Sequence, residues 1–310
     1  MRSKRGGRTC FAAVSKPALA AMVSAIVLCL GVQIPRCQAA STSLLQSGSA
    51  SSSRVSKSPE PSVWTVGDTG AAIWSLHVML SELGYLPCHY EMIVPTDQLY
   101  PWNFAAPPLG YWVWDSPGVP ADVLKAWDPE RYSELTKGAV MHFEADHGLK
   151  IDGYAGPRVR ESLEWALALH VRAESPYRVV VVDQAVPERL RVWEAGRGVV
   201  FESLCSTGVP EAPTEPGVHV IFLRNREQVM QGVGPSGRPY RVEHVPYVSF
   251  FYGEQAIHGF QRAAYGTPQS AGCVELPVPA ASRVWALTHY GTVVCVLPPP
   301  AASRQADGRQ

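Results

Sequence analysis

The stretch AIHGFQRAAYGTPQSAGCVEL, residues 256–276, carries the residues on which the interpretation of the chain depends. His258 follows an apolar, strand-like run, and Cys273 lies fifteen residues further on, between a glycine and a second apolar run. The segment between them is rich in turn-forming residues, which can bring two distant side chains together. A thiol attacks carbonyls only as a thiolate, and a neighbouring imidazole can hold that form. The alternative is an inert, buried thiol, the state of most free cysteines.

Residues 177–297 have the pattern of a β-rich domain. Short runs of β-branched residues alternate with glycine and proline turns, and include YRVVVVD (177–183), GVHVIF (217–222) and GTVVCVL (291–297). Closely spaced strands of this kind predict a mainly antiparallel β-sandwich or a barrel-like sheet. One helix is predicted over 279–290, with Val284 and Leu287 facing inward.

The stretch 256–276 resembles the signature of the YkuD-like L,D-transpeptidase catalytic domains. That signature has His-Gly, a loop, Ser or Thr, any residue, Gly-Cys and an apolar residue. The matching positions are His258, Gly259, Ser270, Gly272, Cys273 and Val274. The flanks that resemble the family are CSTG (205–208), TEPGVHVI (214–221), in which Glu215 is inserted before Pro216, and HYGTVVCVL (289–297). The resemblance therefore covers 177–297.

The resemblance implies an enzyme that transfers acyl groups between peptidoglycan stem peptides. It implies that Cys273 attacks the carbonyl of the third, L-centre residue of a donor tetrapeptide, so that the terminal D-alanine leaves and a thioester forms. A side-chain amine of a second stem then gives a 3→3 cross-link, in cell-wall synthesis or remodelling. His258 would act as the general base and then as the acid. The backbone carbonyl of Gly259 would orient its other ring nitrogen.

Three further residues are expected to support this chemistry. The backbone N–H groups of Gly272 and Cys273 are candidates for stabilising the oxyanion, because a glycine permits close approach. Ser270 either supports the loop or is an ordinary turn residue. Tyr247, in VPYVSFF, either lines the pocket or is a cross-strand packing residue. No cofactor and no metal are expected.

Two positions depart from the family pattern. The residue between Ser and Gly is often His in the family, and here it is Ala271. Two residues after the cysteine the family often has Arg or Asn, and this chain has Glu275. A positive group there could hold a substrate carboxylate. Glutamate cannot, so substrate choice and turnover are left open.

Residues 63–172 are expected to form a separate, small helical domain. Helices are predicted within 66–87, 136–149 and 157–171. The positions that carry a resemblance are Gly67, Gly70, Ile73, Leu76, Leu80, Leu83, Gly84, Tyr85, Thr136, Ala139, Val140, Phe143, Gly148, Leu149, Asp152, Gly153, Gly156 and Leu163. This pattern resembles the peptidoglycan-binding domain of cell-wall hydrolases, with His77 and Glu144 where that family usually has glutamines. The resemblance implies binding to the peptidoglycan, glycan included. The predicted class is thus α+β with two domains.

An aromatic-rich insertion, residues 86–135, separates the first two predicted helices, where the family has a short loop. Its aromatic residues are Tyr90, Tyr100, Trp102, Phe104, Tyr111, Trp112, Trp114, Trp127 and Tyr132. Exposed aromatic rings could stack on sugars. The alternative is that they form the core of a small inserted subdomain, because a loop of this length usually needs packing of its own.

The N-terminus, residues 1–40, has the pattern of an export signal. A basic segment (1–16) precedes an apolar stretch (17–35), and small residues then fit cleavage near Ala39 or Ala40. The alternative is an uncleaved membrane anchor, because the apolar run is near the length that spans a bilayer. In both cases the bulk of the chain is expected to work outside the cytoplasm, extracellularly or in the cell wall or envelope.

The Ser-rich residues 41–62 predict a flexible linker, and residues 298–310 predict a disordered tail.

Composition and charge exclude nucleic acids as binding partners. Formal net charge is zero over 310 residues, but the first 40 carry six basic residues and no acid. Removing those six from the 27 basic residues leaves 21 against 27 acidic ones. No basic stripe remains for phosphates, so nucleic-acid binding is not expected.

Four cysteines lie outside the signal: Cys88, Cys205, Cys273 and Cys295. They are far apart and form no CxxC pair, which disfavours a zinc ribbon. Cys205 and Cys295 are predicted to be buried thiols, with a disulfide between them as the alternative.

Two other functions stay open. One keeps the thioester and uses water as the acceptor, which is an L,D-carboxypeptidase. The other is a wall-binding protein whose catalytic domain has decayed. The intact His258, Gly272 and Cys273 argue against decay, whereas Glu275 argues for it. A metallopeptidase is disfavoured because no ligand set is recognised, and the oligomeric state is not predicted.

Overall fold

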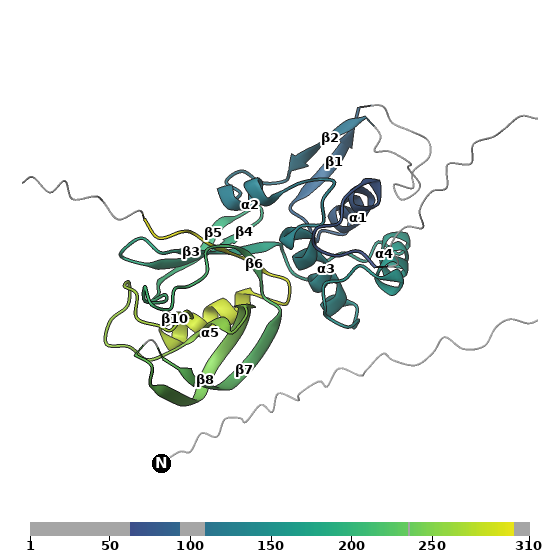
Figure 1. The fold of residues 1–310 in the computed structure, drawn as a ribbon. Coiled ribbons are helices and arrows are strands. Elements are labelled where there is room, and N and C mark those ends of the chain that lie inside the picture. Colours follow the sequence, from purple (N-terminus) through teal and green to yellow (C-terminus); the bar gives the residue numbers. More distant parts are fainter. Residues whose placement is uncertain (1–62, 94–108, 235, 301–310) are drawn as a thin grey trace, which may run out of the picture. The chain divides into compact units, whose positions relative to one another are not determined.

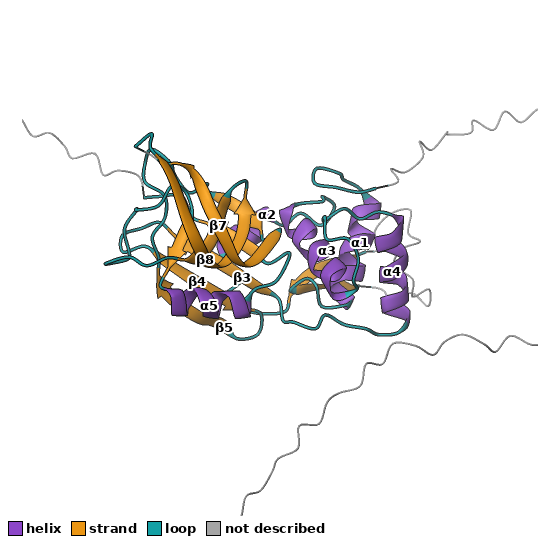
Figure 2. Ribbon diagram, turned by 90° about the horizontal axis from the view of Figure 1, so that it is seen from below, coloured by secondary structure: helices purple, strands orange, loops and turns teal. Residues whose placement is uncertain are grey.

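The computed structural model describes residues 63–93, 109–234 and 236–300 (Figure 1). The predicted signal (1–40), the predicted linker (41–62) and the tail beyond residue 300 lie outside the described residues. Most of the helices come first along the chain, and the two larger sheets follow (Figure 2). In this described part, no helix combines the length and the apolar composition that a membrane crossing requires.

Three helices share one apolar core. Their bounds are α1 (Ala71–Glu82), α3 (Glu134–Asp146) and α4 (Pro157–Ala168). Leu76, Phe143 and Leu163, one from each helix, are fully buried in this core. At the start of α3 the Ser133 N–H donates to the Thr136 hydroxyl (3.1 Å), which satisfies one backbone donor that the helix leaves free. All three helices lie within or beside the segments where the apolar spacing predicts them.

The segment between α1 and α3 contains a two-stranded antiparallel sheet and a short helix. Their bounds are β1 (Cys88–Met92), β2 (Gly110–Trp114) and α2 (Ala121–Ala126). The ring of Trp127 lies edge-on to Trp112 (5.2 Å) and to Trp114 (5.7 Å), and all three pack against the helical core. These tryptophans follow the packing alternative. The aromatic residues between 94 and 108 lie outside the described residues.

From residue 178 onward the chain forms two sheets. The five-stranded sheet has the order β5-β4-β3-β11-β6. Its strands are β3 (Arg178–Asp183), β4 (Arg189–Glu194), β5 (Gly198–Leu204), β6 (Gly217–Val220) and β11 (Val293–Val296). The four-stranded sheet has the order β10-β9-β8-β7. Its strands are β7 (Leu223–Val233), β8 (Pro239–Tyr252), β9 (Gln255–Gly259) and β10 (Val274–Leu276).

One apolar core contains side chains from both of these sheets and from α5 (Val278–Leu287). Val180, Ile257 and Val284 are members from the three elements, and each is buried. The helix ends three residues before its predicted end, because Thr288 has extended backbone (φ −113°, ψ 161°). The β-rich character of residues 177–297 is confirmed.

Strands β9 and β10 pair in parallel, and this pairing builds the candidate site. Antiparallel neighbours can be joined by a tight turn, whereas parallel neighbours need a long connection. Residues 260–273 form that connection. The register places Glu275 beside His258. Two residues that are far apart in the sequence therefore lie next to each other, and Cys273 directly precedes β10.

A third apolar cluster contains residues of α3 and of the five-stranded sheet, among them Leu135, Met141, Val179 and Val293. Two imidazoles accompany it, the buried His142 and the half-buried His289. The ring of His142, on α3, stacks on that of His289, with centroids 3.6 Å apart.

Candidate active site

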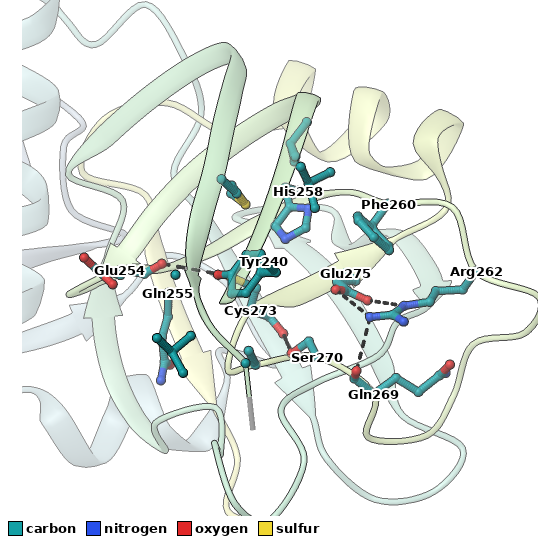
Figure 3. Close-up of a pocket in the computed structure, with 17 residues that line it drawn as sticks. Tyr240, Glu254, Gln255, His258, Phe260, Arg262, Gln269, Ser270, Cys273 and Glu275 are labelled. Carbon is teal, nitrogen blue, oxygen red and sulfur yellow. Dashed lines mark hydrogen bonds and ion pairs between the residues drawn. The ribbon is translucent and has the colours of Figure 1, made fainter. Parts of the chain in front are cut away.

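A cavity of about 370 Å³ has both Cys273 and His258 in its lining (Figure 3). The β7–β8 hairpin contributes apolar side chains such as Met230, Val242 and Val245. Strands β9 and β10 and the connection between them contribute polar side chains. A concave site with apolar walls and a few converging polar groups is typical of a substrate pocket.

His258 is buried on β9 and is oriented by its neighbour. Its Nδ1 lies 3.1 Å from the backbone oxygen of Gly259. A carbonyl only accepts, so Nδ1 carries the proton and Nε2 has the free lone pair. Burial lowers the pKa of His258, since it disfavours the charged ring. The imidazole is thus neutral near pH 7 and able to accept a proton at Nε2.

Cys273 is a free, half-buried cysteine. Burial raises the pKa of the thiol to about 11, and the nearby carboxylates of Glu275 and Glu254 act in the same direction. Sγ lies 3.9 Å from the backbone oxygen of Glu254, a weak contact. No hydrogen bond joins the described side chains of Cys273 and His258. The free protein therefore holds a neutral thiol and a neutral imidazole in one cavity, not an ion pair.

The loop before the cysteine is held by Ser270. Its hydroxyl donates to the backbone oxygen of Cys273 (2.6 Å) and accepts the N–H of Gly272 (3.1 Å). Ser270 is therefore a support of the loop. In the free site the Gly272 N–H is engaged by this hydroxyl, so the Cys273 N–H is the candidate donor that this contact does not occupy. Gly272 has φ +109°, a conformation that favours glycine.

A buried carboxylate braces the same loop from the CSTG segment. The backbone N–H and the hydroxyl of Thr207 donate to Glu188 (2.8 and 2.6 Å). The carbonyl of Thr207 accepts the N–H of Ser270 (2.9 Å). Glu188 is fully buried, and burial raises its pKa. Because Glu188 precedes a strand and not the cysteine, sequence reasoning missed it.

Thr214 ties the TEPG segment to the cysteine loop. Its hydroxyl accepts the N–H of Gly208 (2.8 Å) and donates to the backbone oxygen of Gly272 (2.9 Å). The side chain is fully buried. The family-like TEPG motif could have signalled this role, because a threonine hydroxyl can serve as donor and acceptor at once.

Tyr247 and Tyr240 differ in their relation to the cavity. Tyr247 does not line the cavity. Its ring packs against the apolar core, 6.3 Å from the ring of Trp285, which is the packing alternative. Tyr240, from the β7–β8 hairpin, lines the cavity instead (Figure 3). The long hairpin folds back over the site, which the sequence pattern of its strands does not reveal.

Glu275 does not stand alone in the cavity wall. The Nε–H of Arg262 donates to Glu275 Oε2 (2.6 Å), and Nη2 donates to Oε1 (2.9 Å). The side chains are 28% and 7% exposed. A positive group is thus present, but it comes from the connection after His258 instead of from the second position after the cysteine. Sequence reasoning missed Arg262 because the loop path decides this pairing.

The other described cysteines are free, buried thiols: Cys88, Cys205 and Cys295. Burial raises the pKa of Cys205 and of Cys295, which makes both unreactive. Within the described ranges no cluster of three or more histidine, cysteine or acidic side chains is arranged to hold a metal ion.

Comparison with known proteins identifies the sheet region. Residues 177–296 match the family model of the L,D-transpeptidase catalytic domain, YkuD. This confirms the resemblance of 177–297, although the match does not extend to the helical residues before it. The comparison with curated proteins gave no match.

Several solved structures are similar to parts of the chain. An L,D-transpeptidase from Mycobacterium smegmatis is 20% identical, over 39% of this chain and 59% of that one, with a TM-score of 0.35. The catalytic domain of an E. faecium L,D-transpeptidase is 22% identical, over 40% and 99%, with a TM-score of 0.36. A fused Zn-dependent amidase/peptidase/peptidoglycan-binding protein from Clostridium acetobutylicum is 14% identical, over 76% and 100%, with a TM-score of 0.37. The chain thus spans about three fifths of the M. smegmatis protein.

Proposed function

We propose, from the match of residues 177–296 to the L,D-transpeptidase catalytic domain, that this chain is a cysteine acyltransferase acting on peptidoglycan stem peptides. The observation that carries the proposal is the shared cavity of Cys273 and His258, in which the carbonyl of Gly259 fixes the imidazole tautomer. A nucleophile, a base and an orienting group are the three parts that acyl transfer needs.

In the proposed reaction Cys273 attacks the carbonyl of the third stem residue. The thiol proton moves to Nε2 of His258 as the carbon–sulfur bond forms, because Nδ1 already carries a proton. The oxyanion is stabilised by the Cys273 N–H. His258 then protonates the leaving amine of the terminal residue, and a thioester remains.

The second half of the reaction consumes the thioester. A side-chain amine of another stem attacks the thioester carbonyl and gives a 3→3 cross-link, while its proton returns through His258 to the thiolate. The alternative is attack by water, which gives an L,D-carboxypeptidase. The apolar hairpin wall supports transfer, because excluding water favours the amine over hydrolysis.

The uncharged state of Cys273 and His258 in the free site determines when the proton is transferred. A protonated thiol beside a neutral base reacts slowly until a substrate brings a carbonyl and excludes solvent. Proton transfer then accompanies attack, and no stable thiolate has to be kept in an exposed pocket.

The test of the proposal is acylation by a carbapenem, followed by intact-mass measurement. We expect a single adduct on the wild type, none on Cys273→Ala, and formation at least a hundredfold slower on His258→Gln, within the range assigned to general-base catalysis. Cys205→Ala, at a buried thiol outside the cavity, is the matched control and should form the adduct like the wild type.

Absence of an adduct on the folded wild type at high carbapenem concentration would support the decayed-domain alternative instead. Incubation with tetrapeptide stems then separates the two enzymes. Cross-linked dimers indicate transfer, whereas tripeptides alone indicate the carboxypeptidase.

We place the enzyme outside the cytoplasm, in the cell wall or envelope, on the pattern of residues 1–40. The helical residues 63–172 would hold it on peptidoglycan. Binding of the purified chain to isolated cell-wall sacculi, compared with residues 177–310 alone, tests this part.

A further inference from the structure

Arg262 is the one arginine or lysine among the described residues that line the cavity. It lies four residues after His258, in the connection that leads to Cys273. The cavity also holds the carboxylates of Glu254 and Glu275. Among the described lining residues, Arg262 is therefore the arginine or lysine side chain that can bind an anionic group of a substrate.

Three contacts fix the Arg262 side chain. Two of its nitrogens donate to Glu275, and Nη2 donates in addition to the backbone oxygen of Gln269 (3.1 Å). The guanidinium carbon lies 4.7 Å from the centre of the Phe260 ring. Figure 3 shows the guanidinium held between Glu275 and Gln269. A guanidinium held in this way has already lost most of its rotational freedom.

One amino group of Arg262 is left over. A guanidinium has five N–H donors, and Nη1 makes no hydrogen bond to any described residue. The Arg262 side chain as a whole is 28% exposed, and Arg262 lines the cavity. A structural pair that only neutralised the buried Glu275 would be complete with the contacts already made. Nη1 is therefore a charged donor without an acceptor among the described residues.

The distance from the nucleophile limits what Nη1 can bind. Cys273 and Glu275 both line the cavity, and two residues of extended chain span about 7 Å. Arg262 lies beside Glu275. When a carbonyl carbon sits at the sulfur, a group that reaches Arg262 must belong to the residue next to it. The α-carboxylate of a leaving residue is about 4 Å from the attacked carbon, with its oxygens further out.

We infer that Arg262 binds the free α-carboxylate of the residue that leaves, and that Glu275 holds Arg262 in place for this task. The substrate class is then a peptide that ends one residue after the attacked carbonyl. A stem that continues beyond this residue, or whose end is amidated, lacks the anion. Arg262 is a specificity-determining residue, and this inference rests on the proposed acyl transfer.

The first experiment measures anion binding without the proposed reaction. Iodoacetate and iodoacetamide both alkylate Cys273: the thiol proton is lost to solvent, the thiolate sulfur bonds to the CH₂ carbon, and iodide leaves. Only iodoacetate carries a carboxylate. The measured quantity is the ratio of the two rate constants, followed by intact mass. Differences in thiol reactivity between variants cancel in this ratio.

The key variant is Arg262→Gln/Glu275→Gln, which removes both charges and leaves the net charge unchanged. It also avoids a buried, unpaired carboxylate, which would destabilise the fold. We expect the iodoacetate-to-iodoacetamide ratio to fall about tenfold, in line with the loss of one charge-assisted hydrogen bond. Arg262→Lys should give a ratio between those of the wild type and the double variant, because lysine keeps the positive charge but lacks the planar guanidinium donors.

Arg283→Gln is the matched control, because Arg283 is exposed on α5 and does not line the cavity. Its ratio should equal that of the wild type. A ratio in the double variant that also equals the wild-type ratio overturns the inference, provided that thermal melting shows both variants folded.

The second experiment compares a stem tetrapeptide with its C-terminal amide. The wild type should acylate from the free acid at least tenfold faster, and the double variant should treat both alike. Equal rates in the wild type overturn the inference. If neither peptide reacts while the alkylation ratio falls as expected, the proposed function fails and the anion site stands.

Discussion

At the scale of single residues, burial sets the pKa of Cys273 and of His258. The free thiol of Cys273 has a pKa raised to about 11, and the pKa of His258 is lowered. Both shifts keep the pair uncharged at neutral pH. A resting thiolate–imidazolium pair would require the opposite shifts.

This state predicts the pH dependence of alkylation in the free protein. The thiolate fraction of a group with a pKa of about 11 rises tenfold per pH unit through the whole range from 7 to 10. We therefore expect the iodoacetamide rate constant of Cys273 to rise steadily up to pH 10. A plateau beginning near pH 7 would show a preformed ion pair and contradict the assignment.

The conformation of Gly272 gives a second prediction at this scale. Its φ is +109°, and an added Cβ would lie 3.1 Å from the side-chain nitrogen of Gln255. Gly272→Ala should lower the free energy of unfolding by about 2 kcal/mol, measured in urea, and should slow carbapenem acylation.

Gly156→Ala serves as its control. Gly156 has φ −76°, and an added Cβ would meet only an ordinary contact at 3.8 Å. Its cost should stay below about 0.5 kcal/mol. Equal losses in the two variants would mean that backbone conformation at Gly272 is not the cause.

Sequence reasoning could predict part of this residue-level chemistry. The contact of His258 with Gly259 joins adjacent residues, so the His-Gly motif was sufficient to predict it. The engagement of the Gly272 N–H by Ser270 depends on a rotamer, and the pairing of Arg262 with Glu275 depends on the path of a loop. A signal for the pair was present, because opposite charges follow His258 and Cys273 at short distances.

At the scale of elements, the cysteine loop is positioned by segments remote in the sequence. Thr207 bonds to Ser270, and Thr214 bonds to Gly272. Both segments belong to the region before β7. The loop is therefore a product of the whole sheet region and not of the motif alone.

Thr214→Val tests this support. Valine has a similar shape but no hydroxyl, so the Gly208 N–H and the Gly272 carbonyl both lose a buried partner. We expect a loss of about 2 kcal/mol in the free energy of unfolding and slower acylation of Cys273. Thr69→Val, at an exposed threonine, should change neither. Acylation of Thr214→Val at the wild-type rate would show that this tie does not position Cys273.

Element types were predictable where periodicity is strong. The apolar spacing that predicted helices corresponds to α1, α3 and α4, and the β-branched runs correspond to strands. The parallel pairing of β9 with β10 was not predicted, because closely spaced strands favour antiparallel pairing. The connection 260–273 has little regular structure. No local sequence pattern therefore predicted the path by which it brings β10 back beside β9.

At the scale of the whole molecule, buried histidines couple stability to pH. Burial lowers the pKa of His142 to about 2 and that of His289 to about 4. In the unfolded chain both return to about 6.5. The unfolded state therefore binds more protons below pH 6.5, so stability is full above this value and falls as the pH decreases.

We expect the free energy of unfolding to drop between pH 7.5 and 5 by up to about 2 kcal/mol for each of these histidines, in line with 1.4 kcal/mol per pKa unit. In the variant His142→Gln/His289→Asn this drop should shrink. His170→Asn, at an exposed position, should retain the wild-type dependence. An unchanged pH dependence in the double variant would assign the effect to other groups.

The origin of the cysteine loop's bracing has a practical consequence for engineering. Glu188, Thr207 and Thr214 are contributed by chain that precedes the His258–Cys273 motif by dozens of residues. Transplanting residues 256–276 onto a foreign scaffold would move Cys273 without the hydrogen bonds that hold its loop. An autonomous fragment must therefore start upstream of Glu188, and a circular permutant is best opened elsewhere than between 188 and 276.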